Sequence, residues 1–307
     1  MLTMAFVAVA VPALVGTILY LLPRSPWVAV GPHAHEGRRV VPGTAALSLG
    51  AAFALSVWLQ EGTTAPWAQW HTVPFVIGAF AVLSLVRGSH ERPLDGMLGC
   101  VSAPFMALVA ALLVFFMRFP AWTAGDRALA ALAALPLAFV LCPSIGSAPA
   151  TTAMIGAVAC GSMASLCMAS GFAKLALALA AVAALLLAMS MVCRWNRRVT
   201  PGVGVATLLS ALLVGSAAAG QAHDYATFAP HWWWVVALSP IAPVLTVPLV
   251  GRAASSSTAA VTKIVVVALV CAVAVVSAWG AKRAASEPVA AAQSCSDGGF
   301  VRHSAHG

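Results

Sequence analysis

Long apolar stretches recur along this chain, and short polar or basic connections separate them. A helix needs about 20 mainly apolar residues to cross a bilayer, and the pattern therefore predicts about ten transmembrane helices. The fifth, sixth and seventh stretches run together with little polar separation, so a count of eight or nine also remains open. The predicted spans cover about residues 1–22, 41–60, 73–87, 96–117, 127–143, 148–170, 172–193, 200–221, 231–250 and 258–280.

The residue types within these stretches favour helices over strands. Ala, Leu and Val dominate, with Gly and Ser interspersed, which is typical of helices that pack closely through small residues. Hydrophobic residues make up 62% of the chain and charged residues 8%, against roughly 25% charged residues in soluble proteins. We therefore predict an all-α, polytopic integral membrane helical bundle over residues 1–283. A short tail, residues 284–307, follows and is predicted to be disordered.

Acidic residues are absent from the middle of every predicted span. A carboxylate buried in a membrane bundle usually marks a proton relay or an ion path. Its absence predicts that uncharged helices fill the apolar region and that chemistry is left to the water-facing ends. The eight carboxylates are Glu36, Glu61, Glu91, Asp95, Asp126, Asp224, Glu287 and Asp297.

Lys and Arg predict the orientation of the helices. The odd-numbered connections carry ten of these residues, and the even-numbered connections before the tail carry three. The positive-inside bias then places the odd connections in the cytoplasm and both termini outside, in a membrane of the bacterial inner (plasma) membrane type. Lys282 and Arg283 in the tail oppose this orientation. Residues 1–22 lack the basic start of a secretory signal and are predicted to be the first span.

Charge and motifs exclude several functions. The net charge is +8, but the basic residues lie at helix ends rather than in a stripe, so no nucleic-acid partner is predicted. The expected partners are the lipid bilayer and other membrane subunits. No nucleotide-binding loop, zinc-protease motif or serine-hydrolase elbow occurs, and the seven cysteines form no C-x-x-C pair. A non-catalytic protein without a cofactor is favoured, although the question of an enzyme stays open.

One candidate site lies in two polar connections, residues 61–71 and 221–231. Both contain a proline, aromatic residues and a closing histidine, and both face the predicted outer side; chance explains this likeness better than duplication. If the connections meet, His71, His223, Asp224 and His231 could bind a metal ion or carry protons. The favoured alternative is an aromatic belt at the membrane surface. It would contain Trp67, Trp70, Trp122 and Trp232 to Trp234.

Two weaker patterns complete the picture of candidate chemistry. His33 and His35, with His90 and Glu91, could form a cytoplasmic metal site, but a plain solvated loop is favoured. In the sixth span, small residues recur every four positions, which predicts a tightly packed central helix against the eighth span. These small residues are Ala153, Ala157, Gly161, Ser165 and Ala169.

Prolines interrupt the predicted ninth span and define a second candidate site. Pro240 and Pro243 each free a backbone carbonyl that must be satisfied by protein or water, and Ser239 and Thr246 are placed to do so. Lys263, near the inner end of the last span, is interpreted as a snorkelling side chain.

Two functions follow from these patterns. The first is a non-catalytic membrane subunit or scaffold. The alternative is a permease for a neutral or weakly polar solute, with the proline-broken ninth helix lining the path. No resemblance to a known family is recognised.

Overall fold

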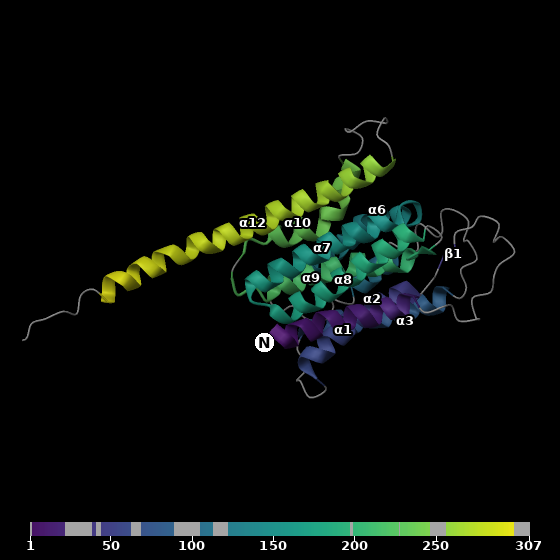
Figure 1. Cartoon of the computed structure of the whole chain (residues 1–307). Coiled ribbons are helices and arrows are strands. Elements are labelled where there is room, and N and C mark those ends of the chain that lie inside the picture. The colour runs from purple at the N-terminus through teal and green to yellow at the C-terminus, as the bar shows by residue number, and fades with distance from the viewer. Residues whose placement is uncertain are drawn as a thin grey trace, which may run out of the picture.

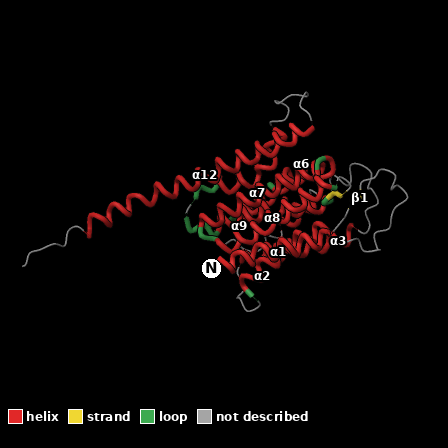
Figure 2. Tube along the Cα trace, in the orientation of Figure 1, coloured by secondary structure: helices red, strands yellow, loops and turns green. Residues whose placement is uncertain are grey.

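Helices form nearly all of the structure, a computed structural model of the chain. The structure describes residues 2–21, 39–40, 44–62, 69–88, 105–112, 122–196, 199–226, 228–245 and 256–297. Within these ranges the one exception to helix and connecting turns is a pair of two-residue strands. Figure 1 shows the helices side by side in one bundle, and Figure 2 shows the strand pair at one end of it.

The elements follow the predicted apolar stretches closely. In the first half they are α1 (Leu2–Leu21), β1 (Arg39–Val40), α2 (Thr44–Glu61), the 3-10 turn η2 (Gln69–His71), α3 (Thr72–Gly88) and a helical segment over residues 105–112. Next come α5 (Ala124–Leu132), α6 (Ala134–Ser147), α7 (Pro149–Ser170), α8 (Ala173–Trp195) and β2 (Val199–Thr200). The last are α9 (Val203–Ala222), α10 (His231–Leu238), the 3-10 turn η3 (Ser239–Ile241) and α12 (Ser256–Asp297).

Five described helices are long and apolar enough to cross a membrane, and they indicate a membrane-embedded protein. They are Ala124–Ser147, Pro149–Ser170, Ala173–Trp195, Val203–Ala222 and Ser257–Ala281. Shorter apolar helices cover Ala5–Leu21, Val73–Leu83 and His231–Leu245. Each of the ten predicted ranges contains described helix, so the all-α prediction is confirmed.

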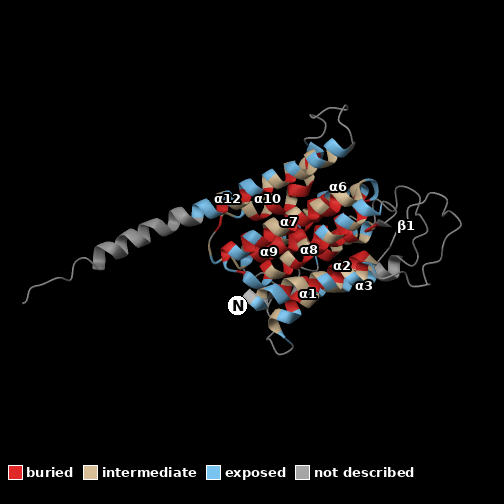
Figure 3. Ribbon diagram, in the orientation of Figure 1, coloured by how far each residue is buried: buried red, intermediate tan, exposed pale blue. Residues whose placement is uncertain are grey.

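Helix α9 forms the centre of the bundle. Every residue from Val205 to Gly220 is buried, and α9 contacts α2, α3, α5, α6, α7 and α10. Figure 3 shows the buried residues gathered between the helices and the exposed ones on the outside. Helix α7, the predicted sixth span, also contacts five other helices, α6, α8, α9, α10 and α12, and most of its residues are buried.

Small residues let α9 approach its neighbours closely. At Gly156 of α7, an added Cβ would lie 2.6 Å from Leu209 of α9. At Gly220, it would collide with the ring of Trp233 in α10. The small-residue series of α7 plays a different part, because Ala157, Gly161 and Ser165 line a shallow groove toward α12. The sequence predicted that these residues pack against the eighth span, which is α9. The three residues named here face α12 instead.

Connections of the same parity meet at the same end of the bundle. β1, in the first predicted connection, pairs in parallel with β2 in the seventh. At the opposite end, Lys174 after the sixth connection bonds to Glu61, which opens the second. Figure 1 shows β1 and the N-terminus at opposite ends. The first and seventh connections therefore lie at one end of the bundle, and the second and sixth lie at the other, as the predicted alternation requires.

The last helix extends into the range predicted to be a disordered tail, residues 284–307, and the disorder itself stays a prediction. Helix α12 continues to Asp297, and Figure 1 shows its last part projecting beyond the other helices. The physical reason is the local composition, since residues 284–294 are rich in Ala, which has the highest helix propensity. Residues 298–307 lie outside the described part of the chain.

Candidate functional site

The predicted ninth span is broken at its prolines. Helix α10 ends at Leu238, η3 follows over Ser239–Ile241, and helix resumes at residues 242–245. Pro240 cannot donate to the carbonyl of Val236, and the Ser239 hydroxyl donates to it instead at 2.8 Å. The backbone N–H of Ala242 donates to the carbonyl of Ser239. Both carbonyls freed by the prolines are therefore satisfied within the chain.

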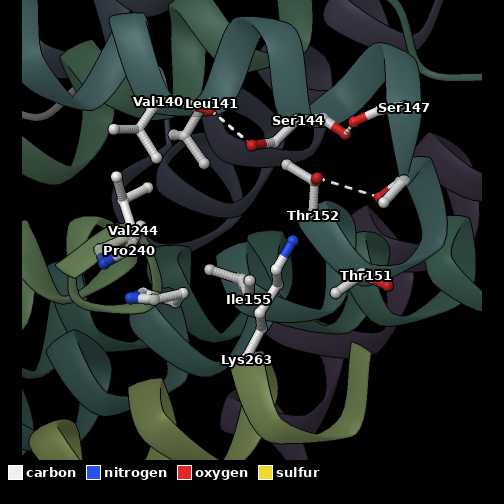
Figure 4. Close-up of a pocket in the computed structure, with 12 residues that line it drawn as sticks. Val140, Leu141, Ser144, Ser147, Thr151, Thr152, Ile155, Pro240, Val244 and Lys263 are labelled. Carbon is white, nitrogen blue, oxygen red and sulfur yellow. Dashed lines mark hydrogen bonds between the residues drawn. The ribbon is translucent and has the colours of Figure 1, made fainter. Parts of the chain in front are cut away.

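A partly enclosed cavity of about 270 Å³ lies beside this break. Pro240, Pro243 and Val244 form one side, α6 and the start of α7 form another, and Lys263 enters from α12. Figure 4 shows these side chains around the cavity. Two of the four residues proposed for a solute path, Pro240 and Pro243, therefore line a cavity.

Ser239, the third residue proposed for that path, does not line the cavity. Ser239 is buried, and it accepts a hydrogen bond from the Sγ of Cys271 at 3.2 Å while donating to Val236. The hydrogen bond between Ser239 and Cys271 links the broken helix to α12. Thr246 lies outside the described residues. The cavity and the helix break are adjacent, but the Ser239 hydroxyl is bonded to the backbone carbonyl of Val236 and not directed into the cavity.

The polar lining of the cavity consists of hydroxyl groups and one amine. Ser144 donates to the carbonyl of Val140 at 2.6 Å, and Thr152 donates to that of Ala148 at 3.0 Å. Ser147 donates to the carbonyl of Pro143 at 3.1 Å. These three hydroxyls have used their single hydrogen. Thr151 and Lys263 are the other polar side chains of the lining, which contains no Asp or Glu.

The opposite end of the bundle holds Glu61, the carboxylate that opens the predicted second connection. The Glu61 side chain is only 6% exposed, and it contacts the imidazole of His71 and the ammonium of Lys174. The Lys174 Nζ lies 2.7 Å from Oε1, and this lysine is 54% exposed. Glu61 ends α2, so the carboxylate is enclosed by protein at a helix end and not at the middle of a span. This position agrees with the absence of carboxylates from the middle of the predicted spans, but the side chain itself is buried.

Aromatic rings join His71 to the second polar connection. Trp70 packs edge-on against Phe172 with ring centroids 5.3 Å apart, and Phe172 stacks on His223 at 5.0 Å. Phe172 lies in the turn between α7 and α8, and no feature of the sequence pointed to it. The two connections with closing histidines therefore meet through Phe172, with His71 against the ring of Trp70 and His223 against the ring of Phe172.

Asp224 organises the turn after α9. Its carboxylate accepts hydrogen bonds from the backbone N–H groups of Ala226 at 2.9 Å and Phe228 at 2.7 Å. It also accepts a longer one from the Trp233 Nε1 at 3.4 Å. Trp233 is fully buried and Trp70 is 4% exposed. The prediction of a surface belt was therefore wrong for these two tryptophans, which lie in the core.

The four residues proposed for metal or proton chemistry do not form a metal-binding group. Across the described part of the chain, no three His, Cys, Asp or Glu side chains are arranged to hold a metal ion. His231 is exposed at the start of α10 and contacts the ring of Trp232. The proposed cytoplasmic group of His33, His35, His90 and Glu91 lies outside the described residues, as does Trp67.

The two ends of the bundle thus offer different chemistry. At one end Glu61 is paired with Lys174 and His71 and aromatic rings pack together, whereas the end with Lys263 has a cavity and a cation. Comparison with known proteins adds no assignment: no family model matches the chain, and no match is found among curated proteins or solved structures.

Proposed function

We propose that the chain is a polytopic integral membrane protein of about ten spans that acts as a non-catalytic subunit or scaffold. The observation that carries the membrane placement is the outward face of α12. Large apolar side chains recur there at exposed positions and would form a costly apolar patch in water, but lipid covers such a face without cost. These residues are Val261, Val265, Leu269, Val273 and Val276.

The distribution of charge supports the same placement. The described Glu61, Lys174 and Arg194 lie at helix ends, where charged groups reach water or headgroups. Extraction of membranes with alkaline carbonate tests the proposal. The chain is expected to stay in the membrane fraction, and its release into the soluble fraction would contradict the proposed bundle.

For the orientation, we favour the odd connections inside a bacterial-type inner membrane and both termini outside. The excess of Lys and Arg in the odd connections supports this choice. The contact between β1 and β2 supports a common side for two of those connections. Reporter fusions after Leu21 and after Trp195 are expected to be active on the cytoplasmic side. Activity of either fusion on the outer side would reverse or break the proposed topology.

The role of a scaffold is supported by how the carboxylates are used. Glu61 is paired with two side chains, and Asp224 accepts three hydrogen bonds from its own turn. Groups held in this way serve packing rather than proton transfer. Purification in a mild detergent, followed by cross-linking, is expected to recover a second protein in fixed proportion. A strictly solitary monomer would contradict the role of a subunit.

A permease is the second candidate, and the cavity beside the helix break favours it. Broken helices next to a partly enclosed cavity are typical of solute sites in transporters. Uptake of neutral and weakly polar solutes into proteoliposomes tests this candidate. Pro243→Ala is expected to reduce uptake, because the variant restores a backbone donor at the break. Unchanged uptake in the Pro243→Ala variant would contradict the proposal that the broken helix lines the solute path.

A further inference from the structure

The ammonium group of Lys263 lines the cavity without an ion pair to any described residue. In the described part of the chain, both ion pairs involve Glu61 at the opposite end of the bundle. Lys263 has no described carboxylate partner, and the described residues that line the cavity include no Asp or Glu. Figure 4 shows its side chain directed between Ile155 and Thr152, toward the hydroxyl groups of α6 and α7. The sequence interpretation was a snorkelling lysine, but the side chain lies against protein on the α7 side.

Donors for a ligand come from two side chains. The hydroxyl hydrogens of Ser144, Ser147 and Thr152 are donated to backbone carbonyls. The Thr151 hydroxyl and the Lys263 ammonium make no hydrogen bond to the described residues. A group that accepts from both, and that carries negative charge, complements the cavity.

The remaining walls are apolar. Val140, Leu141 and Ile155 lie on one side, and Pro240 and Val244 lie on another. The hydrocarbon part of a ligand could pack against these apolar side chains. A small inorganic anion would leave that surface unused, whereas an amphipathic anion uses both the donors and the apolar walls.

We infer that this cavity binds the anionic headgroup of an amphipathic molecule, a phosphate or a carboxylate, with Lys263 as counter-ion and Thr151 as the second donor. Basic pockets between membrane helices suit anionic headgroups because the surrounding low dielectric strengthens the pairing. The inference rests on the proposed membrane bundle but not on transport. The headgroup can come from a membrane phospholipid or from a free amphipathic acid.

Titration of the purified full chain tests the inference. Native mass spectrometry and thermal shift in a neutral detergent would compare dioleoyl phosphatidylglycerol, dioleoyl phosphatidylcholine, oleate and inorganic phosphate. Phosphatidylglycerol or oleate is expected to bind at least about tenfold more tightly than phosphatidylcholine. Preference for phosphatidylglycerol assigns a membrane lipid as the source, and preference for oleate assigns a free acid. Equal binding of the charged and zwitterionic lipids, or a response to inorganic phosphate alone, would overturn the inference.

Variants separate the site from general surface charge. Lys263→Met keeps the apolar stem and is expected to remove the preference for the anion, while Lys263→Arg keeps it. Thr151→Val is expected to weaken it by a smaller factor. Arg194→Met is the matched control, because Arg194 is an exposed cation at the same end of the bundle. An equal loss in Arg194→Met, or a retained preference in Lys263→Met, would overturn the site.

The outcome also separates this inference from the proposed function. Thermal unfolding without lipid shows whether Lys263→Met is folded. If that variant does not fold, the lipid preference of Lys263→Arg, measured beside that of Arg194→Met, tests the site. Release of the chain by carbonate would remove the membrane bundle itself. A chain that stays in the membrane but shows no dependence on Lys263 would remove only the anion site.

Discussion

The Lys174 Nζ lies 2.7 Å from the Glu61 Oε1 and so joins the start of α8 to the end of α2, 113 residues apart in sequence. His71 contacts the other carboxylate oxygen. The two basic groups leave Glu61 enclosed, while Lys174 itself stays more than half exposed. This asymmetry of burial decides which partner matters more for stability.

Glu61→Gln is expected to lower the free energy of unfolding by roughly 1–3 kcal/mol, because it removes the charge from a buried, doubly paired group. Lys174→Met is expected to cost less than about 1 kcal/mol, because the lysine is solvated. Thermal unfolding of both variants in one detergent measures the difference. A larger loss in Lys174→Met would contradict the proposed importance of the enclosed carboxylate.

The contact between Gly220 and Trp233 predicts a clash for the smallest side chain. Gly220→Ala would place its Cβ into the Trp233 ring, and is expected to destabilise the fold by roughly 1–3 kcal/mol through overpacking. Gly78→Ala in α3 is the control, since an added Cβ there meets nothing within 4 Å. It is expected to be neutral or to stabilise by up to about 1 kcal/mol through helix propensity. Equal effects of the two variants in thermal unfolding would place α10 farther from α9.

Asp224→Ala is expected to loosen the turn after α9, because three donors lose their acceptor. A buried donor left without a partner costs about 1–3 kcal/mol. Hydrogen exchange of the Ala226 and Phe228 amides measures the change, and both are expected to exchange faster than in the native chain. Asp126→Ala is the matched control, because this exposed carboxylate bonds only within the start of α5. Unchanged exchange in Asp224→Ala would show that the turn holds without the carboxylate.

The strand pair predicts a specific cross-link between distant connections. Arg39 and Val199 are partners in the parallel pair of β1 and β2, so the double variant Arg39→Cys, Val199→Cys is expected to form a disulfide on mild oxidation. The variant Arg39→Cys, Ala222→Cys is the control, because Ala222 ends α9 at the other end of the bundle. The shift on a gel, removed by reductant, reports the bond. A cross-link in the control alone would contradict the alternating traverse.

The apolar pattern was sufficient to predict helices and their approximate ends. Each stretch of about 20 apolar residues can satisfy its backbone only by helix in a low-dielectric region, so local sequence decides the outcome. The predicted tenth span ends at about residue 280 because the following residues are too polar to count as part of a span, whereas helix α12 continues to Asp297.

Partnerships between side chains were not predictable in the same way. Asp224 and His223 stood out as polar residues, but nothing in the sequence indicated that Phe172 would stack on His223 or that Lys174 would reach Glu61. Phe172 is one apolar residue among many, and its value arises only from the turn that brings it between two connections. The sequence predicted two of the residues that line the cavity, Pro240 and Pro243, because a proline interrupts the hydrogen bonds of a helix wherever it occurs.

The sequence by itself determined the apolar, helical character of this protein and the placement of its charges at helix ends, because those properties follow from the chemistry of each segment alone. Tertiary structure decided that α9 is a central helix, that Glu61 is enclosed, and that Lys263 lies in a cavity with no carboxylate among its described lining residues. These outcomes depend on which faces pack together, and helices of nearly uniform Ala, Leu and Val composition have no strongly marked apolar face. Packing of small residues such as Gly156 and Gly220 selected the partners instead, since close approach is possible only where a side chain is missing.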